Sequence, residues 1–522
     1  MNNIINFFRP IKEAFTFFLI IWITSTITDV IPAYATKDYR LCIYIAMGSS
    51  LFSFIISLFT SIITKEKLRN ILQYSIFIYF LVYNFVNLYC IYILKSPSIV
   101  NIASIIANSN LNEVQEFISH AVKPLYYLLG LIIFSFLIFL FSQIIKIKVR
   151  HGFFPLLLGT LLLLCSIYTT IHKPWILSET SHGKTILSFK TIIDSPPQLS
   201  NFLTNPAIQE THHYHPQNIV IIIGESYSKH HSSLYGYEKQ TNPLLAQEKL
   251  LYIYKNTISP ATHTIDAFKA FMSTYSPDRH SDDMWYRMPT IPEVFNIAGY
   301  HSIWISNQNR KGFYENIPSK YSELCHKAIF INERDTTHSY DIDILNEIKE
   351  LTNNHTKNIY FIHLMGQHVT FESRYPSSFK KFQSEDYEEY PEHQRSNRAN
   401  YDNATLYNDF VVHSIIQEFS NKETILFYFS DHGLDIYDTS NTYCGHANSS
   451  KESIKFGKQI PFMIYTSPSF VQAYSSSDII QKLQMRTKQE YCIDDIIYTI
   501  MDIAGYKFKN NTDVETYSLF AQ

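Results

Sequence analysis

Hydrophobic positions are unevenly distributed along this chain of 522 residues. Five long stretches in the first third are nearly free of charged residues: 14–33, 41–63, 71–94, 124–144 and 153–171. Each approaches or exceeds the roughly 20 residues that a helix needs to cross a bilayer core of about 30 Å. The pattern therefore predicts a domain of five transmembrane helices over residues 1–171. A cleaved signal peptide suits the first stretch less well, because four more spans follow and no small-residue cleavage site is evident.

Basic residues between these stretches predict the orientation of the chain. Lys and Arg are more frequent before the first stretch, between the second and third, and between the fourth and fifth than in the opposite loops. By the positive-inside rule the N-terminus is expected in the cytoplasm, and five spans then place everything after about residue 172 outside. In a Gram-negative cell this would be a multi-pass inner-membrane protein with a periplasmic C-terminal domain.

Two further segments are interpreted as membrane-associated connections. The loop 96–123 is too polar to span and too apolar for a free linker, so it is expected to be an interfacial helical piece near the lipid headgroups, with a solvated connecting helix as the alternative. Its candidate polar contacts are Asn108, Glu113 and Glu116. Residues 172–216 contain prolines and polar residues without a sustained period, which is typical of a linker with an amphipathic element along the membrane.

After residue 217, short apolar runs alternate with amphipathic stretches. The expected strands are 218–223, 301–305, 358–363, 424–429 and 461–465. The expected helices are 264–275, 290–298, 341–352 and 399–420, while the polar stretch 373–398 is interpreted as a surface excursion. This alternation predicts a second, α/β domain over 217–522 with a mostly parallel central sheet between helices.

Carboxylates and imidazoles occur where the predicted strands end. Six such residues are Glu225, His363, His368, Asp431, His432 and His446. Ligands of open α/β sheets bind outside the carboxyl ends of the strands, so these side chains are expected to gather there. A lone histidine is more often a hydrogen-bonded core or surface residue. The adjacent pair Asp431 and His432 nevertheless favours a metal, because burying both without a purpose would cost desolvation free energy.

Oxygen and nitrogen donors without thiolate indicate zinc at a catalytic site, with manganese or magnesium as alternatives. The stretch NTISPATHTIDAFKAFMSTYS, residues 256–276, supplies hydroxyls just before a predicted helix. Thr264 would be the N-cap, with Asp266 in the first turn. A hydroxyl at a helix N-terminus lies where backbone N–H groups hold phosphate oxygens, and a metal would lower its pKa. These arguments do not separate Thr262 from Thr264, and capping alone is the commoner use of such a residue.

Several of these segments, taken together, resemble one family. They include IVIIIGESYSKHHSSLYGY from residue 219, SPATHT at 259–264, HLMGQH at 363–368, YDNATLYND at 401–409 and SDHG at 430–433. Motifs of this kind in this order are similar to those of the phosphoethanolamine transferases of Gram-negative inner membranes, in the alkaline phosphatase/sulfatase superfamily. The resemblance implies a sulfatase-like fold for the C-terminal domain and runs nearly end to end.

The resemblance also implies residue roles. It implies that zinc, one or two ions, is held by Glu225, Thr264, Asp431 and His432. The register of SPATHT selects Thr264 over Thr262 as the nucleophile. His368 and His446 match residues that contact the transferred phosphate group or a second zinc. Candidates for further substrate contacts are Lys311, His363 and, near the lipid headgroup, Asn108, Glu113 and Glu116.

The implied reaction takes phosphoethanolamine from phosphatidylethanolamine, through a covalent intermediate on Thr264, to an envelope acceptor such as lipid A or the lipopolysaccharide core. Pro260 and Lys269 replace cysteines that many relatives carry, so the disulfides bracing that helix are absent and the acceptor stays open. Cys325, Cys444 and Cys492 allow at most one internal disulfide. With 43 basic and 46 acidic residues, the charge balance does not indicate nucleic acid as a partner.

The alternatives are a phosphodiesterase or phosphatase-type hydrolase and a phosphoglycerol transferase of the same superfamily. A sulfatase would need Cys or Ser within C/S-x-P-x-R, and residues 257–266 contain no such motif. A non-catalytic membrane receptor or scaffold is a third alternative. The set of metal-ligand residue types argues against it.

Overall fold

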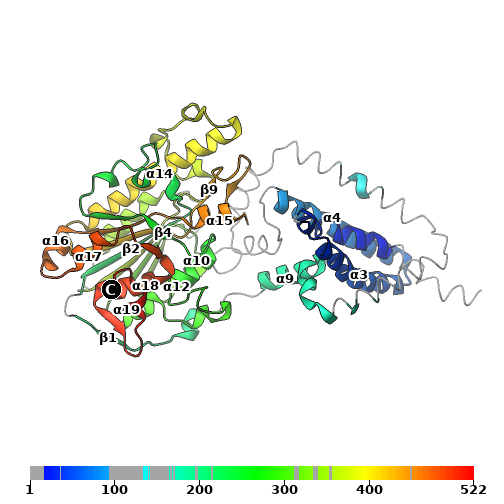
Figure 1. Cartoon of the computed structure of the whole chain (residues 1–522), viewed down its shortest axis with the longest axis horizontal. Coiled ribbons are helices and arrows are strands. Elements are labelled where there is room, and N and C mark those ends of the chain that lie inside the picture. The colour runs from blue at the N-terminus through cyan, green and yellow to red at the C-terminus, as the bar shows by residue number, and fades with distance from the viewer. Residues whose placement is uncertain are drawn as a thin grey trace, which may run out of the picture. The chain divides into compact units, whose positions relative to one another are not determined.

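The computed structural model describes residues 17–35, 37–92, 171–193, 198–212, 215–310, 317–332, 339–351, 356–446 and 450–521, with isolated positions between 133 and 168. The chain forms two compact units, of which the first contains the described residues up to 193 and the second those from 198 onward (Figure 1).

The N-terminal unit is helical. Its main elements are α2 (Ile31–Ala35), α3 (Tyr39–Ile62), α4 (Glu66–Tyr92), and α9 (Ser181–Ile193). Two helical segments, Tyr39–Ile62 and Glu66–Leu88, are long and apolar enough to cross a membrane, and Phe17–Thr26 is a shorter apolar helix. The predicted spans at 124–144 and 153–171 lie almost wholly outside the described residues, so the count of five stays a prediction.

A buried polar contact joins α9 to the first helices of this unit. Lys184 Nζ lies 3.4 Å from Asp29 Oδ1, and both side chains are at most 5% exposed. Tyr83 donates its hydroxyl to the same carboxylate oxygen at 2.8 Å. The segment expected to be a linker therefore contains a helix that packs into the N-terminal unit.

A seven-stranded sheet forms the centre of the C-terminal unit, in the order β3-β11-β8-β2-β7-β5-β6. Its strands are β2 (Asn218–Gly224), β3 (Leu251–Tyr254), β5 (His301–Ser306), β6 (Lys327–Phe330), β7 (Asn358–His363), β8 (Thr424–Ser430) and β11 (Phe462–Thr466). The five strands from β8 to β6 are parallel, whereas β11 is antiparallel to both β8 and β3. The sheet is therefore mixed, with a parallel centre as the sequence predicts.

Helices cover both faces of this sheet (Figure 1). Along β2, Ile219, Ile221 and Ile223 belong to one hydrophobic core, and Val220 and Ile222 belong to another. The first core includes residues of α10 (Thr264–Phe271), α11 (Ile291–Ile297) and α18 (Ile496–Ala504). The second includes residues of α13 (Ile344–Glu350) and α14 (Glu392–Phe419). Burial on both faces explains why these strands are continuous apolar runs.

The structure differs from the prediction in the start of one helix and in two strands that were missed. The stretch 373–398, expected as a surface excursion, contains the beginning of α14 at Glu392 after three short 3₁₀ turns. Edge strands β3 and β6 were not predicted, because four-residue runs such as LYIY and KAIF carry too short a pattern to identify.

Candidate active site

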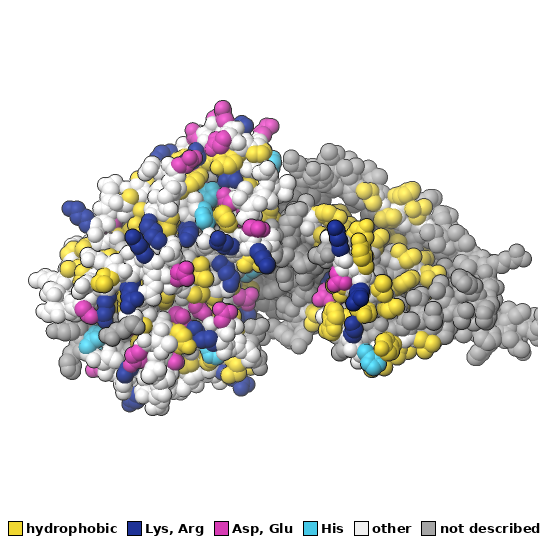
Figure 2. All heavy atoms as spheres, in the orientation of Figure 1, with side chains coloured by type: hydrophobic (Ala, Val, Ile, Leu, Met, Phe, Trp, Pro, Cys, Tyr) yellow, Lys and Arg dark blue, Asp and Glu magenta, His cyan; other side chains and the backbone are white. Residues whose placement is uncertain are grey.

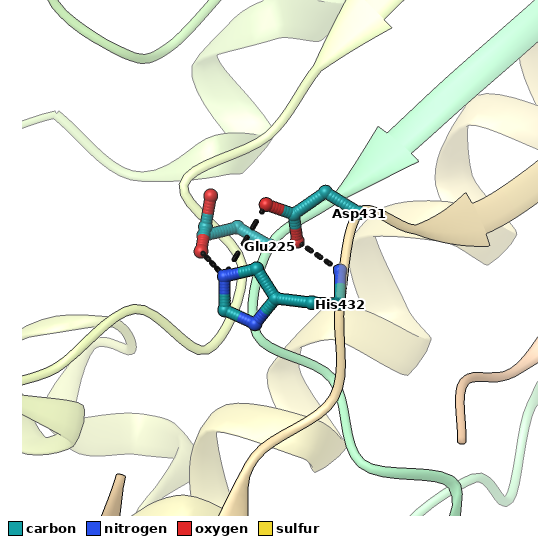
Figure 3. Close-up of side chains that lie close together, drawn as sticks. All are labelled: Glu225, Asp431 and His432. Carbon is teal, nitrogen blue, oxygen red and sulfur yellow. Dashed lines mark hydrogen bonds and ion pairs between the residues drawn. The ribbon is translucent and has the colours of Figure 1, made fainter. Parts of the chain in front are cut away.

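Two neighbouring parallel strands near the middle of the seven-stranded sheet bring three polar side chains together. β2 and β8 pair in register, with Gly224 opposite Ser430, so the residues that follow them emerge at the same edge. His432 Nε2 lies 3.3 Å from Glu225 Oε1 and 3.5 Å from Asp431 Oδ2. Figure 3 shows the three side chains converging, and none is more than 2% exposed. Glu225, Asp431 and His432 are called the acidic cluster below.

Thr264 adds a hydroxyl to the acidic cluster. Its Oγ1 lies 3.3 Å from Glu225 Oε2 and 3.4 Å from His432 Nε2. Thr262 instead has its hydroxyl 3.0 Å from His263 Nδ1. Thr264 was expected to cap α10, but the capping position is His263 and Thr264 is the first helical residue. Its side chain is thus directed to the carboxylates rather than to the helix backbone.

Hydrogen bonds fix the orientation of the cluster. Ser226 has a left-handed backbone, with φ of 58°, and this turn lets its N–H donate to Asp431 Oδ1 at 3.1 Å. Its hydroxyl donates to Glu225 Oε1 at 2.7 Å. His432 Nδ1 is 2.8 Å from the carbonyl oxygen of Gly433, which can only accept. Nδ1 therefore carries hydrogen, which leaves Nε2 of the neutral ring as the nitrogen that could bind a metal.

The backbone of Gly366 packs closely against the backbone of Glu225. Gly366 follows β7 and has a φ of 52°. A Cβ at this position would lie 2.8 Å from both the nitrogen and the oxygen of Glu225. The motif HLMGQH thus needs glycine at 366, because any side chain would displace the turn that carries the carboxylate.

Burial and proximity shift the protonation of the cluster. Burial alone would lower the pKa of His432, but Asp431 and Glu225 raise it to about 9. Burial and then the Glu225 carboxylate raise the pKa of Asp431. Burial alone would raise the pKa of Glu225, but the neighbouring His432 outweighs it and holds the pKa well below its usual range. Two carboxylates against one imidazolium leave excess negative charge, which a bound cation would compensate.

The donor set fits zinc. Donor atoms of a tetrahedral zinc ion lie about 1.63 bond lengths apart, which is roughly 3.3–3.6 Å for bonds of about 2.0–2.2 Å. The contacts of His432 Nε2 and Thr264 Oγ1 with the cluster fall between 3.3 and 3.5 Å, and all ligand atoms of the three cluster residues lie within 4.8 Å of one another. Asp431 Oδ2 is buried and has no hydrogen-bond partner among the described residues, as expected of an atom reserved for a ligand.

Three further histidines surround the cluster. The ring of His446 lies 4.6 Å from that of His432 and 4.7 Å from that of His263. Burial, and then the neighbouring His432 and His263, hold the pKa of His446 well below its usual range, and His368 lies near enough to add to this effect. In the described structure, Nδ1 of His368 and of His446 are buried without a hydrogen-bond partner, so both can serve a phosphate group or a second cation.

The remaining sequence-predicted residues lie elsewhere. His363 is 1% exposed, with Nδ1 3.3 Å from the hydroxyl of Ser306 and its ring against Phe268, so it lies in the packing between β7 and α10. Asn108, Glu113, Glu116 and Lys311 fall outside the described residues. Cys325, Cys444 and Cys492 are free thiols.

Three contacts were not predicted from the sequence. Gln308 follows β5 and places Nε2 3.4 Å from Glu225 Oε2 and 2.9 Å from the carbonyl of Leu364. Its position after a parallel strand was the available signal, by the same rule that identified Glu225. Ser226 and His263 gave weaker signals, because their roles depend on a left-handed turn and on tertiary packing.

Comparison with known proteins places this fold and site in a family. The sequence model of the family described as Sulfatase matches residues 217–506, more than half of the chain, and the protein belongs to that family. The chain is 28% identical over 332 residues to phosphoethanolamine transferase EptC of Escherichia coli strain K12, which covers 60% of this chain and 54% of that protein. The chain thus spans about half the length of the curated relatives it matches.

Two solved structures are similar. The C-terminal periplasmic domain of EptC from Escherichia coli in complex with Zn matches with a TM-score of 0.55 and 25% identity, over 62% of this chain and 90% of that one. The integral membrane protein lipooligosaccharide phosphoethanolamine transferase A (EptA) from Neisseria meningitidis matches with a TM-score of 0.68 over 98% of this chain and 97% of that one. At 16% identity, this second likeness shows the fold alone.

Proposed function

We propose that this protein is a zinc-dependent phosphoethanolamine transferase of the cell envelope. The observation that carries the proposal is the position of the Thr264 hydroxyl, 3.3 Å from Glu225 and 3.4 Å from His432, within a cluster whose dimensions fit zinc. The names of the similar proteins, among them EptC and EptA, support phosphoethanolamine as the transferred group. The proposed donor is phosphatidylethanolamine, and the proposed acceptor is lipid A or the lipopolysaccharide core.

In the first half-reaction, Thr264 Oγ attacks the phosphorus of the donor. The new phosphorus–oxygen bond forms as the bond to the diacylglycerol oxygen breaks. The proton of the Thr264 hydroxyl passes to Glu225 Oε2, which accepts its hydrogen bond, and the diacylglycerol oxygen takes a proton from His368 or His446. Zinc held by Glu225, Asp431, His432 and Thr264 would supply a Lewis acid that lowers the pKa of the hydroxyl and neutralises phosphate charge. Glu225 Oε2, which accepts the hydrogen bond of Thr264, orients the hydroxyl for attack.

In the second half-reaction, an acceptor oxygen replaces Thr264. The acceptor loses its proton to the imidazole that protonated diacylglycerol, the phosphorus–Thr264 bond breaks, Thr264 Oγ takes back its proton from Glu225 Oε2, and the enzyme returns to its starting state. His368 and His446 suit this exchange because their buried Nδ1 atoms have no hydrogen-bond partner in the described part of the chain.

We further propose the membrane arrangement that the sequence predicts: five spans, a cytoplasmic N-terminus and a periplasmic catalytic domain. The two long apolar helices support it. An anchored domain meets a lipid donor at a high effective concentration. In this arrangement Asn108, Glu113 and Glu116 would lie near the donor headgroup, and Lys311 would contact phosphate. A fusion of alkaline phosphatase after residue 180 should be active outside; a silent fusion would contradict the topology.

Intact mass spectrometry of the full chain after incubation with phosphatidylethanolamine tests the reaction. An added phosphoethanolamine on the peptide that holds Thr264 is the expected result. Free phosphoethanolamine without an adduct would favour a hydrolase. The absence of both products would contradict phosphatidylethanolamine as the donor. A phosphoglycerol adduct formed from phosphatidylglycerol would favour the phosphoglycerol transferase.

A further inference from the structure

Four lysines belong to three segments that meet beside the acidic cluster, and they are called the basic patch: Lys229, Lys255, Lys455 and Lys458. Lys229 begins the short turn η3 (Lys229–His231), four residues after Glu225. Lys255 lies between β3 and β4 (Asn256–Ile258), and the other two belong to the last turn of α15 (Lys451–Lys458). Lys255 and Lys455 are exposed, and Lys229 and Lys458 are half-buried.

Backbone contacts place the basic patch against the nucleophile segment. Gly433, next to the cluster residue His432, donates its N–H to the carbonyl of Gly457 in α15 at 2.7 Å. Ser259 donates its N–H to the carbonyl of Lys458 at 2.7 Å, and a Cβ on Gly457 would lie 3.0 Å from the methyl of Thr262. The last turn of α15 therefore forms a wall of the site, directly beside the segment that ends in Thr264.

The strand directions agree with this placement. β3 is antiparallel to β11, and β11 is antiparallel to β8, so β3 and β8 run in the same direction. Lys255 follows β3 as Asp431 follows β8, so both lie at the same edge of the sheet. Figure 2 shows Lys and Arg side chains gathered on the part of the surface where Figure 1 labels α15 and β4.

The positive charge of the patch has no matching acid. Among the described residues, none of the four lysines has a carboxylate oxygen within 4.0 Å. Lys229 Nζ instead lies 3.1 Å from the carbonyl oxygen of Lys255, and Lys255 Nζ lies 2.5 Å from that of Leu234. Burial, and then the charges of Lys455 and Lys255, lower the pKa of Lys229. Such mutual repulsion is relieved when an anion binds.

Aliphatic side chains border the lysines. Ile454 on α15 is 36% exposed and Ile258 on β4 is 40% exposed. Ile258 forms a β-bridge with Gln459, which follows α15, so both isoleucines border the same helix. Exposed aliphatic residues mixed with lysines are typical of surfaces that meet anionic lipid headgroups at a membrane.

We propose that the basic patch binds the acceptor as a phosphate-bearing glycolipid and holds it beside Thr264 for the second half-reaction. This inference rests on the proposed transferase function. A neutral sugar acceptor would gain little from four lysines. The donor headgroup has no net charge, and its ammonium would be repelled by the patch, so the patch discriminates between the two lipid substrates.

The test compares two triple variants of the full chain in mixed micelles. The patch variant carries Lys255→Gln, Lys455→Gln and Lys458→Gln. The control carries Lys249→Gln, Lys327→Gln and Lys349→Gln, three exposed lysines. Lys249 precedes β3, Lys327 is the first residue of β6, and Lys349 lies in the last turn of α13, which precedes β7, so all three lie toward the opposite edge of the sheet. Each variant loses three positive charges, so a difference in KM between the two variants is due to where the lysines lie and not to the change in net charge.

Three quantities decide the outcome. The patch variant should raise the KM for diphosphorylated lipid A by at least about tenfold, since each lost phosphate contact weakens binding several-fold. The rate at which Thr264 acquires phosphoethanolamine should stay within about twofold of wild type. Lipid A from which the phosphates have been removed should show no such difference in KM. The control variant should behave as wild type throughout.

Other results would overturn the inference. An unchanged KM for lipid A would do so, and so would an equal rise with the dephosphorylated lipid. If the patch variant binds vesicles of phosphatidylglycerol less well than wild type but has an unchanged KM for lipid A, the basic patch is a general membrane contact instead. If the wild-type protein forms no adduct on Thr264, the proposed function fails, and the basic patch is then tested by binding alone. Retention of wild type, but not of the patch variant, on lipid A vesicles would still support binding of the glycolipid by the basic patch. Equal retention of both proteins would refute it.

Discussion

The hydroxyl of Thr264, at the start of α10, lies 3.4 Å from Nε2 of His432, which follows β8. Three separate segments supply the donor atoms of this site: Glu225 follows β2, Asp431 and His432 follow β8, and Thr264 begins α10. The relationship makes separate predictions for the nucleophile and for the metal ligands.

Replacing the nucleophile should separate chemistry from metal binding. Thr264→Ala is expected to lower phosphoethanolamine transfer by at least about a thousandfold, because the covalent intermediate cannot form. Zinc content should stay near wild type, since the three buried cluster residues are retained. Thr262→Ala is the matched control, because its hydroxyl contacts His263 instead of the cluster. Full activity of Thr264→Ala together with an inactive Thr262→Ala would reassign the nucleophile.

Removing a cluster residue should remove the metal. His432→Ala and Glu225→Ala are expected to lose bound zinc as well as activity, because each leaves only two of the three buried cluster residues to hold the ion, whereas Thr264→Ala keeps all three. Elemental analysis of the purified full chain measures this, and chelation of wild type followed by addition of zinc should reproduce and reverse the loss. His393→Ala, an exposed histidine hydrogen-bonded to the carbonyl of Asn441, is the control. Unchanged zinc in both cluster variants would refute the ligand assignment.

A buried histidine outside the site should make stability depend on pH. His231 Nδ1 lies 2.7 Å from Asp402 Oδ1, and its Nε2 lies 3.6 Å from Asp438 Oδ2. Burial alone would lower the pKa of His231, but the two carboxylates raise it from 6.5 to about 9. Since the folded pKa exceeds the unfolded value, this stabilisation is complete below pH 6.5 and is lost as the pH rises through 9.

The size of that effect is at most on the order of 3 kcal/mol in the free energy of unfolding. Thermal unfolding of the full chain between those two pH values should show a falling Tm. His231→Gln should flatten this part of the profile, whereas His393→Gln should leave its slope unchanged. The same slope in all three proteins would show that His231 is not its cause.

The buried ion pair of the N-terminal unit should couple α9 to the first helices. Lys184→Met leaves Asp29 buried without its cation and is expected to cost about 3–5 kcal/mol of stability. Adding Asp29→Asn should recover part of this loss, because the remaining side chain is neutral and still meets Tyr83. Resistance of the full chain to unfolding in detergent measures both variants. A double variant no more stable than Lys184→Met would show that the pair is not coupled.

The sequence predicted the central strands because burial on both faces leaves long apolar runs such as NIVIII in β2. The edge rule for α/β sheets then located Glu225, Asp431 and His432, since β2 and β8 are neighbours. It did not show that β11 is antiparallel, because an apolar run carries no information on direction. It also did not predict that α14 starts at Glu392, within a stretch whose polar composition resembles a loop.

Site contacts that depend on geometry could not be predicted in the same way. Ser226 reaches two carboxylates through a left-handed turn, and Gly366 is needed because it touches the backbone of Glu225. His363 has the same sequence signal as His368, yet it points into the core while His368 lies near the cluster. The difference between them is set by the pleat of β7 and the turn after it.

The pairing of β2 with β8 also determines when the metal can be acquired. A nascent chain that ends before residue 430 already carries Glu225 and Thr264 but neither Asp431 nor His432. Because the two strands are far apart in the sequence, their pairing closes a long loop, which costs conformational entropy. If the acidic cluster binds zinc as proposed, the ion enters only after synthesis of β8 is complete, and the metal supply that matters is that of the compartment in which this domain finishes folding.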